Sequence, residues 1–346
     1  MPDSLGRSLY LSETDEAMIQ SMDLEGRAVF LSLHRQEEMN ERFAEDMKGF
    51  LKTLNERHCR IIADVSKHTL KAFEVREMNE LIDLLSLYAV RPDYGFEIEE
   101  INATAKRHTV VINASTMREK ELRQLSGREN ILAMHNFYPR PETGLDKDQL
   151  KEKTELLHSL GMKVAAFIPG SDPKRGPLKE GLPTLENHRY IPPYAALADL
   201  LIHYDMDEVF LGDPEIDPEE LARMDRFLGD GVIELPCQLL SGYESLYDRI
   251  FTCRIDSPSS LIRAAESREY SMANNIAVRA EHTVPRVRGS VTMDNEAYLR
   301  YCGEVMITRK DLPEDARVNV IGRVSPGYLS LLDCIKGGAR FVMRQK

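Results

Sequence analysis

The sequence predicts an α/β fold, with a (β/α)8 barrel in residues 1–228 and a small β domain in residues 229–346. Short apolar runs alternate with amphipathic stretches through residues 1–215, which is the pattern of repeated strand and helix units. Eight such runs favour a barrel, because a doubly wound sheet usually has fewer strands. Beyond residue 231, short β-like runs separated by turns favour a small barrel or sandwich.

In the first segment, short apolar runs predict the strands, and apolar residues spaced three or four positions apart predict the helices. The expected strands are residues 6–12, 28–34, 60–66, 87–94, 109–115, 131–137, 163–169 and 208–213. Residues 37–57 predict a helix because apolar side chains such as Met47 and Leu51 recur every three or four positions. Further helices are expected at residues 147–160, 193–201 and 217–227. The Gly229-Asp230-Gly231 sequence is expected to end the last helix.

The second segment has seven expected strands and a less regular pattern. They are residues 232–240, 249–254, 276–280, 290–293, 303–308, 318–324 and 340–343. This segment could cover the barrel mouth, form a homodimer interface or only stabilise the chain.

Composition narrows the class of protein. With 42% hydrophobic and 29% charged residues, the chain has ample material for a packed interior. A net charge of −12 argues against binding to nucleic acid or to an anionic membrane. The five cysteines include no CxxC pair, as expected for buried thiols in a reducing compartment. Neither a membrane span nor a signal peptide is visible, so we expect a cytoplasmic protein.

Polar residues gather at the carboxyl ends of the expected strands, which meet at one mouth of a (β/α)8 barrel. They are Glu13, His34, Asp64, Ser66, Asp93, Tyr94, Asn113, Ser115, His135, Asn136 and Asp213. Two carboxylates beside a substrate can act as proton donor and as base or nucleophile, which is the minimum equipment for cleaving a glycosidic bond. Any single one of them could instead cap a helix or fix a loop.

Metal and nucleotide chemistry find no support in the motifs. The first strand, with Leu9, Tyr10 and Leu11, lacks the histidine pair of metal-dependent barrel hydrolases, and the sequence has no HExxH motif. Neither GxGxxG nor GxxxxGK[ST] occurs. Lys67 is the only lysine near a strand end, which leaves a Schiff-base aldolase unsupported. We expect no metal and no cofactor.

Two long loops suit an anionic sugar. Residues 135–145 carry aromatic side chains that could stack on a sugar ring, unless they pack on a neighbouring loop. Residues 169–186 place Lys174 and Arg175 after the seventh strand, where barrels commonly bind phosphate. The alternative for this second loop is a solvated insertion.

These loops resemble those of the MupG-like 6-phospho-N-acetylmuramidases. The resemblance is carried by IADVS (62–66), PDYGF (92–96), INAST (112–116), HNFYPRPETGL (135–145), RGPLKEGLPTLENHR (175–189), FLGDP (210–214), GSVTMDNEAYLRYCGEVMI (289–307) and RVNVIGRVSP (317–326). Pro92 and Lys179 depart from the family pattern. The resemblance spans nearly the whole chain and implies a TIM barrel followed by a cyclophilin-like β-barrel that is not a prolyl isomerase. It also implies a cytoplasmic enzyme of peptidoglycan recycling, which splits 6-phospho-N-acetylmuramic acid β-1,4-N-acetylglucosamine into N-acetylmuramic acid 6-phosphate and N-acetylglucosamine.

The residues and the resemblance together predict a glycosidase acting on a small phosphorylated amino-sugar disaccharide. Candidate catalytic carboxylates are Asp213, Asp93 and Glu180, with Asp64 in reserve. Candidate ligands for the phosphate or the lactyl carboxylate are Arg140, Lys174 and Arg175, and candidate sugar contacts are His135, Asn136, Asn113 and Tyr138. Retention, inversion and attack by the substrate's own acetamido group all remain open. A barrel lyase or isomerase acting on a phosphosugar, or a non-enzymatic carbohydrate-binding protein, is the alternative.

Overall fold

The computed structural model describes residues 4–10, 19–20, 22–33, 43–267 and 278–346. The chain divides into two compact units, Met1–Leu221 and Ala222–Lys346. Helix α9 (Pro218–Asp230) contains both this division and the expected boundary between residues 228 and 229. The helix was expected to stop before Gly229, but it ends after Asp230, and the positive φ of Gly231 (69°) follows it.

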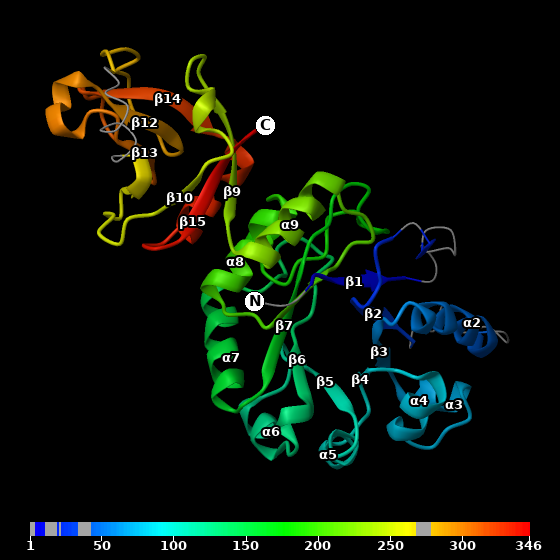
Figure 1. The fold of residues 1–346 in the computed structure, drawn as a ribbon. Coiled ribbons are helices and arrows are strands. Elements are labelled where there is room, and N and C mark those ends of the chain that lie inside the picture. The colour runs from blue at the N-terminus through cyan, green and yellow to red at the C-terminus, as the bar shows by residue number, and fades with distance from the viewer. Residues whose placement is uncertain (1–3, 11–18, 21, 34–42, 268–277) are drawn as a thin grey trace. The chain divides into compact units, whose positions relative to one another are not determined.

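Eight parallel strands close into a barrel in the first unit (Figure 1). They are β1 (Gly6–Leu9), β2 (Ala28–Ser32), β3 (Arg60–Val65), β4 (Ala89–Pro92), β5 (Thr109–Asn113), β6 (Ile131–Met134), β7 (Lys163–Ile168) and β8 (Glu208–Leu211). β1 pairs with β8 through Gly6 and Phe210, which closes the ring. The predicted eight-stranded barrel is therefore confirmed.

The barrel interior follows from the two-residue period of a strand, which points alternate side chains inward. The inner cluster is made by Ala28, Phe30, Ile62, Ala89, Val111, Leu132, Met134, Ala165, Phe167 and Phe210. Gly6 leaves room for the largest of them, because a Cβ at this position would lie 2.4 Å from Cδ1 of Phe210. The packed interior leaves the carboxyl end of the barrel as the place for a cavity.

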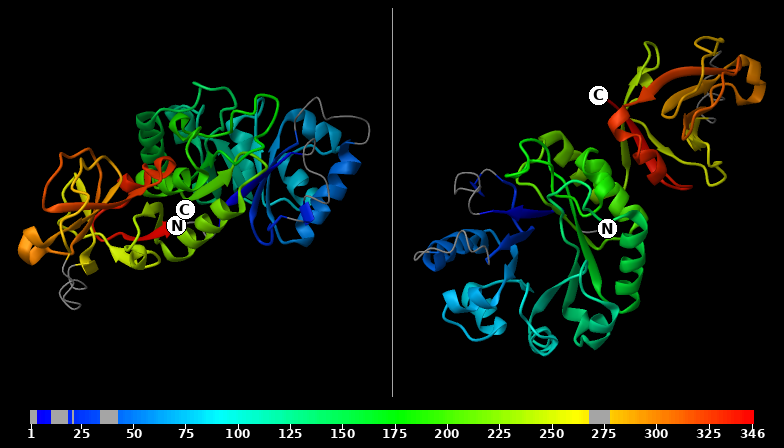
Figure 2. Two further views of the ribbon diagram at one scale, coloured as in Figure 1. Left: turned by 90° about the horizontal axis from the view of Figure 1, so that it is seen from above. Right: turned by 180° about the vertical axis from the view of Figure 1, so that it is seen from behind.

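Helices surround the barrel on its outer side, as the views in Figures 1 and 2 show. They are α2 (Phe43–Glu56), α3 (Lys67–Ala72), α4 (Met78–Leu85), α5 (Ile98–Ala105), α6 (Glu119–Gln124), α7 (Lys147–Ser159) and α8 (Pro193–His203), with 3-10 turns η1 (Arg128–Asn130) and η2 (Glu186–His188). The stripe predicted for α2 is buried at Phe43, Met47, Leu51 and Leu54. None of the described helices is long and apolar enough to cross a membrane.

The second unit contains a seven-stranded sheet in the order β10-β15-β9-β14-β12-β13-β11. Its strands are β9 (Ile233–Leu239), β10 (Ile250–Thr252), β11 (Leu261–Arg263), β12 (Ser290–Asp294), β13 (Val305–Thr308), β14 (Val318–Val324) and β15 (Arg340–Gln345). Short helical elements are η3 (Glu244–Leu246), η4 (Glu296–Tyr301), η5 (Pro326–Tyr328) and α11 (Leu331–Cys334). The sequence missed β11, a three-residue edge strand, and residues 278–280 form no strand. The remainder of that expected strand, residues 276–277, lies outside the described residues.

Candidate functional site

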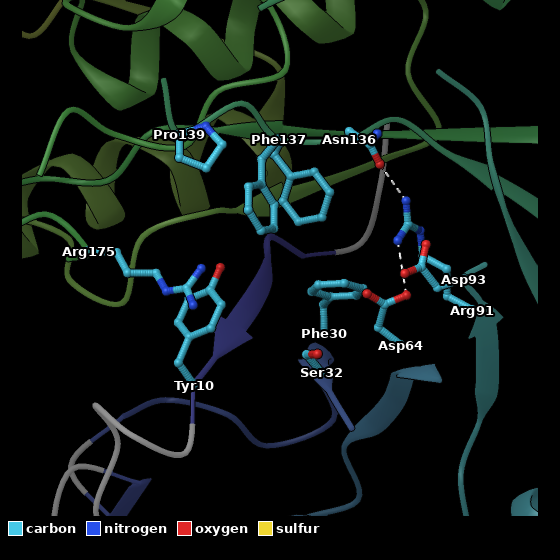
Figure 3. A pocket seen from close by; sticks show the side chains of 11 residues that line it. Tyr10, Phe30, Ser32, Asp64, Arg91, Asp93, Asn136, Phe137, Pro139 and Arg175 are labelled. Carbon is cyan, nitrogen blue, oxygen red and sulfur yellow. Dashed lines mark hydrogen bonds and ion pairs between the residues drawn. The ribbon is translucent and has the colours of Figure 1, made fainter. Parts of the chain in front are cut away.

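A cavity of about 320 Å³ opens at the carboxyl end of the barrel (Figure 3). It is lined by Tyr10, Phe30, Ser32, Asp64, Arg91, Asp93, Asn136, Phe137, Pro139, Phe167 and Arg175. Four of these side chains, Ser32, Asp64, Arg91 and Asn136, continue the inward series of their strands, two positions beyond a residue of the interior cluster. Asp64 follows Ile62 in this way, Arg91 follows Ala89, and Asn136 follows Met134. We name this space the mouth cavity.

An ion pair at the wall of the mouth cavity fixes Asp64. Arg91 donates from Nη1 to Oδ1 of Asp64 at 3.0 Å, and from Nη2 to Oδ1 of Asn136 at 2.5 Å. The Arg91 and Asp64 side chains are only 7% and 10% exposed. The positive charge of Arg91 therefore lies directly against the Asp64 carboxylate. Arg91 was not predicted, although a charged residue inside the apolar run Ala89–Pro92 is a signal that could have found it.

Arg175 presents a permanent positive charge across the cavity from Asp64 and Asp93 (Figure 3). Its guanidinium carbon lies 3.4 Å from the centroid of the Tyr10 ring, a close cation–π contact. The Tyr10 hydroxyl donates to the carbonyl of Gly212 at 2.7 Å, which fixes the ring beneath the guanidinium. Of the three cations predicted to bind an anionic group, Arg175 is the one that lines the mouth cavity.

Asp213 is fully buried and holds the loop that carries Arg175. Its carboxylate accepts hydrogen bonds from the backbone N–H groups of Gly170 (2.8 Å), Arg175 (3.0 Å) and Leu182 (3.1 Å). The side chain is not among those lining the cavity. This geometry is that of a loop-fixing carboxylate, the alternative considered for each acidic strand end.

A second ion pair, between the half-buried Glu186 and the fully buried Arg189, connects the two long loops. Arg189 donates from Nε and Nη2 to the Glu186 carboxylate at 2.6 Å, and these bonds lower the pKa of Glu186 to about 2. Arg189 also donates to the carbonyls of Tyr138 (2.9 Å), Arg140 (3.2 Å) and Glu180 (3.4 Å). Sequence reasoning missed this pair, because a side chain that binds backbone carbonyls leaves no periodic pattern.

Four of the predicted site residues belong to this loop scaffold. Tyr138, Arg140, Lys174 and Glu180 do not line the mouth cavity. Lys174 donates from Nζ to the Arg189 carbonyl at 3.4 Å and lies 5.9 Å from the Tyr190 ring centroid. Glu180 accepts from the Tyr190 hydroxyl at 3.2 Å. The aromatic ring at the cavity is instead Phe137, which packs edge-on against Phe167 at 5.2 Å between centroids.

His135 and Asn136 lie on opposite sides of the strand end. Asn136 lines the cavity, whereas the fully buried His135 contacts the Ser115 hydroxyl through Nδ1 at 3.3 Å. Burial lowers the pKa of His135 to about 3, and the charge of Lys153 adds to the shift. The ring therefore stays neutral. Glu13 and His34, also predicted at the mouth, lie outside the described residues.

A second cavity, of about 530 Å³, lies at the loops after β4 and β5. It is lined by Pro92, Asp93, Tyr94, Gly95, Phe96, Glu97, Ile98, Ile101, Ile112, Asn113, Thr116, Met117 and Glu121. Asn113 thus lines this loop cavity and not the mouth cavity. Asp93 lines both.

Comparison with known proteins places the chain in a family. Residues 5–226 match the model of the 6-phospho-N-acetylmuramidase N-terminal region, and residues 233–344 match the model of its C-terminal region. The chain belongs to the 6-phospho-N-acetylmuramidase family. The resemblance seen in the sequence motifs is confirmed.

Solved structures of similar proteins share the architecture of this 6-phospho-N-acetylmuramidase family member. A conserved protein of unknown function from Enterococcus faecalis is 30% identical, with a TM-score of 0.85 over 99% of this chain and 96% of that one. A B. cereus protein is 23% identical, with a TM-score of 0.82 over the full length of both chains. No curated protein matches the sequence significantly.

The motifs that carried the family resemblance have distinct places in the site. IADVS (62–66) and PDYGF (92–96) supply Asp64 and Asp93 at the cavities. HNFYPRPETGL (135–145) and RGPLKEGLPTLENHR (175–189) form the two loops joined by Glu186 and Arg189. Both sets of motifs contribute residues to the lining of the mouth cavity, and the second set also forms the two joined loops.

Proposed function

We propose that the mouth cavity hydrolyses the β-1,4 bond between 6-phospho-N-acetylmuramic acid and N-acetylglucosamine. Membership of the family supports the activity. One observation in the structure supports the assignment of this activity to the mouth cavity. Asp64 and Asp93 face one cavity that also contains the fixed guanidinium of Arg175. The products are N-acetylmuramic acid 6-phosphate and N-acetylglucosamine, and the reaction belongs to cytoplasmic peptidoglycan recycling.

The two carboxyl groups suit different steps because their surroundings differ. Asp64 is buried and paired with Arg91, so we assign it the charged role beside the anomeric carbon. Asp93 is exposed and lines the same cavity, where a leaving group can reach it, so we assign it the role of proton donor. In the reaction, the proton of Asp93 goes to the glycosidic oxygen as the bond from this oxygen to the anomeric carbon breaks. Water then supplies hydroxide to the anomeric carbon and returns a proton to the carboxylate pair.

We assign the binding of the substrate phosphate to Arg175. A guanidinium can donate two parallel hydrogen bonds to a phosphate, and its charge persists at every physiological pH. Stacking on Tyr10 and the backbone bond to Asp213 hold Arg175 in place before a ligand arrives. Such preorganisation reduces the entropy lost on binding. Lys174 and Arg140, outside the cavity, are not needed for this contact.

For the second unit, the family resemblance implies a fold and the absence of one activity. We propose that residues 229–346 form a cyclophilin-like domain without prolyl isomerase activity. A homodimer formed through this unit remains a proposal.

The function is tested by incubating the purified protein with the phosphorylated disaccharide, with the same disaccharide lacking phosphate, and with N-acetylmuramic acid 6-phosphate alone. Release of N-acetylglucosamine from the first substrate, much faster than from the second, is expected. Conversion of the phosphosugar monomer without any release from the disaccharide would instead indicate a lyase or isomerase. Tight binding of the disaccharide with no turnover would indicate a carbohydrate-binding protein.

A further inference from the structure

We propose that the loop cavity binds the leaving sugar as an uncharged ring, and that Asp93 marks the junction between the two sugar subsites. The inference rests on the proposed function, which supplies a disaccharide. Beyond that function, it assigns a second binding site, the class of sugar that occupies this site and the orientation of the disaccharide across the two cavities.

The position of Asp93 is the first step. Among the residues lining the two cavities, all of them in the described part of the chain, Asp93 is the only one that they share. A disaccharide has one oxygen between its rings, and the proton donor must come within hydrogen-bond reach of that oxygen. A carboxyl group between two cavities meets this requirement if one ring occupies each.

Charge decides which ring enters which cavity. The mouth cavity is lined by the guanidinium groups of Arg91 and Arg175 as well as by the carboxylates of Asp64 and Asp93, so positive and negative charges balance there. The charged side chains lining the loop cavity are all acidic, namely Asp93, Glu97 and Glu121. A phosphate or a lactyl carboxylate would be repelled there, because like charges at such short range are unfavourable. The anionic sugar therefore lies in the mouth cavity and the neutral sugar in the loop cavity.

The lining of the loop cavity suits a neutral sugar ring. Tyr94 is 91% exposed, so its aromatic face is open for stacking. Phe96 is less suitable, because the Lys67 ammonium lies 4.4 Å from its ring centroid. Asn113 is held by the Ser115 N–H, which donates to Oδ1 at 3.1 Å, and its amide offers N–H donors to ring hydroxyls or to an acetamido oxygen. Aromatic and amide groups of this kind recognise sugars without a charge.

The test compares two substrates that differ in the leaving group. One is the phosphorylated disaccharide. The other is the methyl glycoside of N-acetylmuramic acid 6-phosphate, whose leaving group puts only a methyl group in the loop cavity. The variants are Tyr94→Ala and Asn113→Ala. The matched control is Tyr88→Ala. Tyr88 is 40% exposed and directly precedes β4, at the end of the strand opposite the mouth.

Tyr94→Ala is expected to lower kcat/KM for the disaccharide about tenfold, while the methyl glycoside reacts as with the wild type. Asn113→Ala should act in the same direction, and Tyr88→Ala should leave both substrates unchanged. N-acetylglucosamine should inhibit more strongly than its 6-phosphate. Equal losses on both substrates, or stronger inhibition by the phosphate, would overturn the subsite while leaving the glycosidase intact. No N-acetylglucosamine release by the wild type would overturn the proposed function and this inference with it.

Discussion

Arg91 and Asp64 form a buried ion pair at the mouth of the barrel, with Nη1 and Oδ1 3.0 Å apart. The pair sits on neighbouring strands, where Asp64 is in register with Arg91. A second bond from Arg91 to Asn136 extends the network to β6. The orientation of Asp64 therefore depends on Arg91 as much as on its own strand.

Loss of Arg91 should destabilise the protein more than loss of the whole pair. Arg91→Leu removes the cation that faces the buried Asp64 carboxylate, and breaking a buried ion pair from one side costs about 3–5 kcal/mol in the free energy of unfolding. The Asp64→Leu, Arg91→Leu double variant should lose less free energy of unfolding, since it buries neither charge of the pair. Arg60→Leu, which breaks the more exposed pair with Glu208, should cost about 1 kcal/mol or less. Denaturant unfolding measures all three, and a double variant less stable than Arg91→Leu would contradict this view of the pair.

Asp213 should affect the reaction by holding the loop that carries Arg175 and not by contacting the substrate. The two Asp213 oxygens together accept from three backbone N–H groups, two at Oδ2 and one at Oδ1. Asp213→Asn replaces one of these oxygens by an NH2 group, so we expect a loss of about 1–3 kcal/mol in stability together with weaker binding of phosphosugars. Thermal unfolding and ligand titration measure the two effects. A variant with wild-type stability and no turnover would instead give Asp213 the direct catalytic role predicted from the sequence.

Arg175 should discriminate between phosphorylated and unphosphorylated sugars. Removing charge-assisted hydrogen bonds worth about 1.5–3 kcal/mol weakens binding roughly ten- to a hundredfold. Arg175→Ala should show this loss for N-acetylmuramic acid 6-phosphate and little loss for N-acetylmuramic acid in calorimetric titrations. Lys174→Ala is the matched control from the same loop, outside the cavity. Equal weakening for both sugars would remove the phosphate contact from Arg175.

Asp294, in the second unit, should make stability depend on pH. Burial, with the nearby charges of Glu304 and Asp315, raises the pKa of Asp294 to about 7, and Oδ1 has no hydrogen-bond partner in the described chain. The folded form therefore retains a proton that the unfolded chain releases near its ordinary pKa of 3.8. Stability contributed by the neutral form is present below pH 4 and is lost as the pH rises to about 7.

Asp294→Asn should accordingly stabilise the protein by roughly 2–4 kcal/mol at pH 8 and change it little at pH 4. Unfolding curves at the two pH values measure the difference. Glu314→Gln, at an exposed position in the same unit, should have no effect at either. A uniform change at both pH values would show that Asp294 is already ionised in the folded protein at low pH.

The periodicity of the sequence predicted the barrel because each strand is a short apolar run whose alternate side chains fill the interior. The same period distinguishes Asn136, which faces the cavity, from its neighbour His135, which faces outward. Contacts between distant loops, such as Arg189 with the Tyr138 carbonyl, depend on loop conformation and leave no trace in local spacing. The hydrogen bonds from the distant loop to Asp213 were hidden for the same reason.

The central claim is that Asp64 and Asp93 cleave the phosphorylated disaccharide at the barrel mouth. Its most direct test is the rate of N-acetylglucosamine release by the wild type, Asp64→Asn and Asp93→Asn, with Asp83→Asn, an exposed position on α4, as the control. Removing a proton donor costs about 10²–10⁴ in rate. We predict losses of at least a hundredfold for Asp64→Asn and Asp93→Asn in folded proteins, and none for Asp83→Asn. Wild-type rates in both variants would contradict the account.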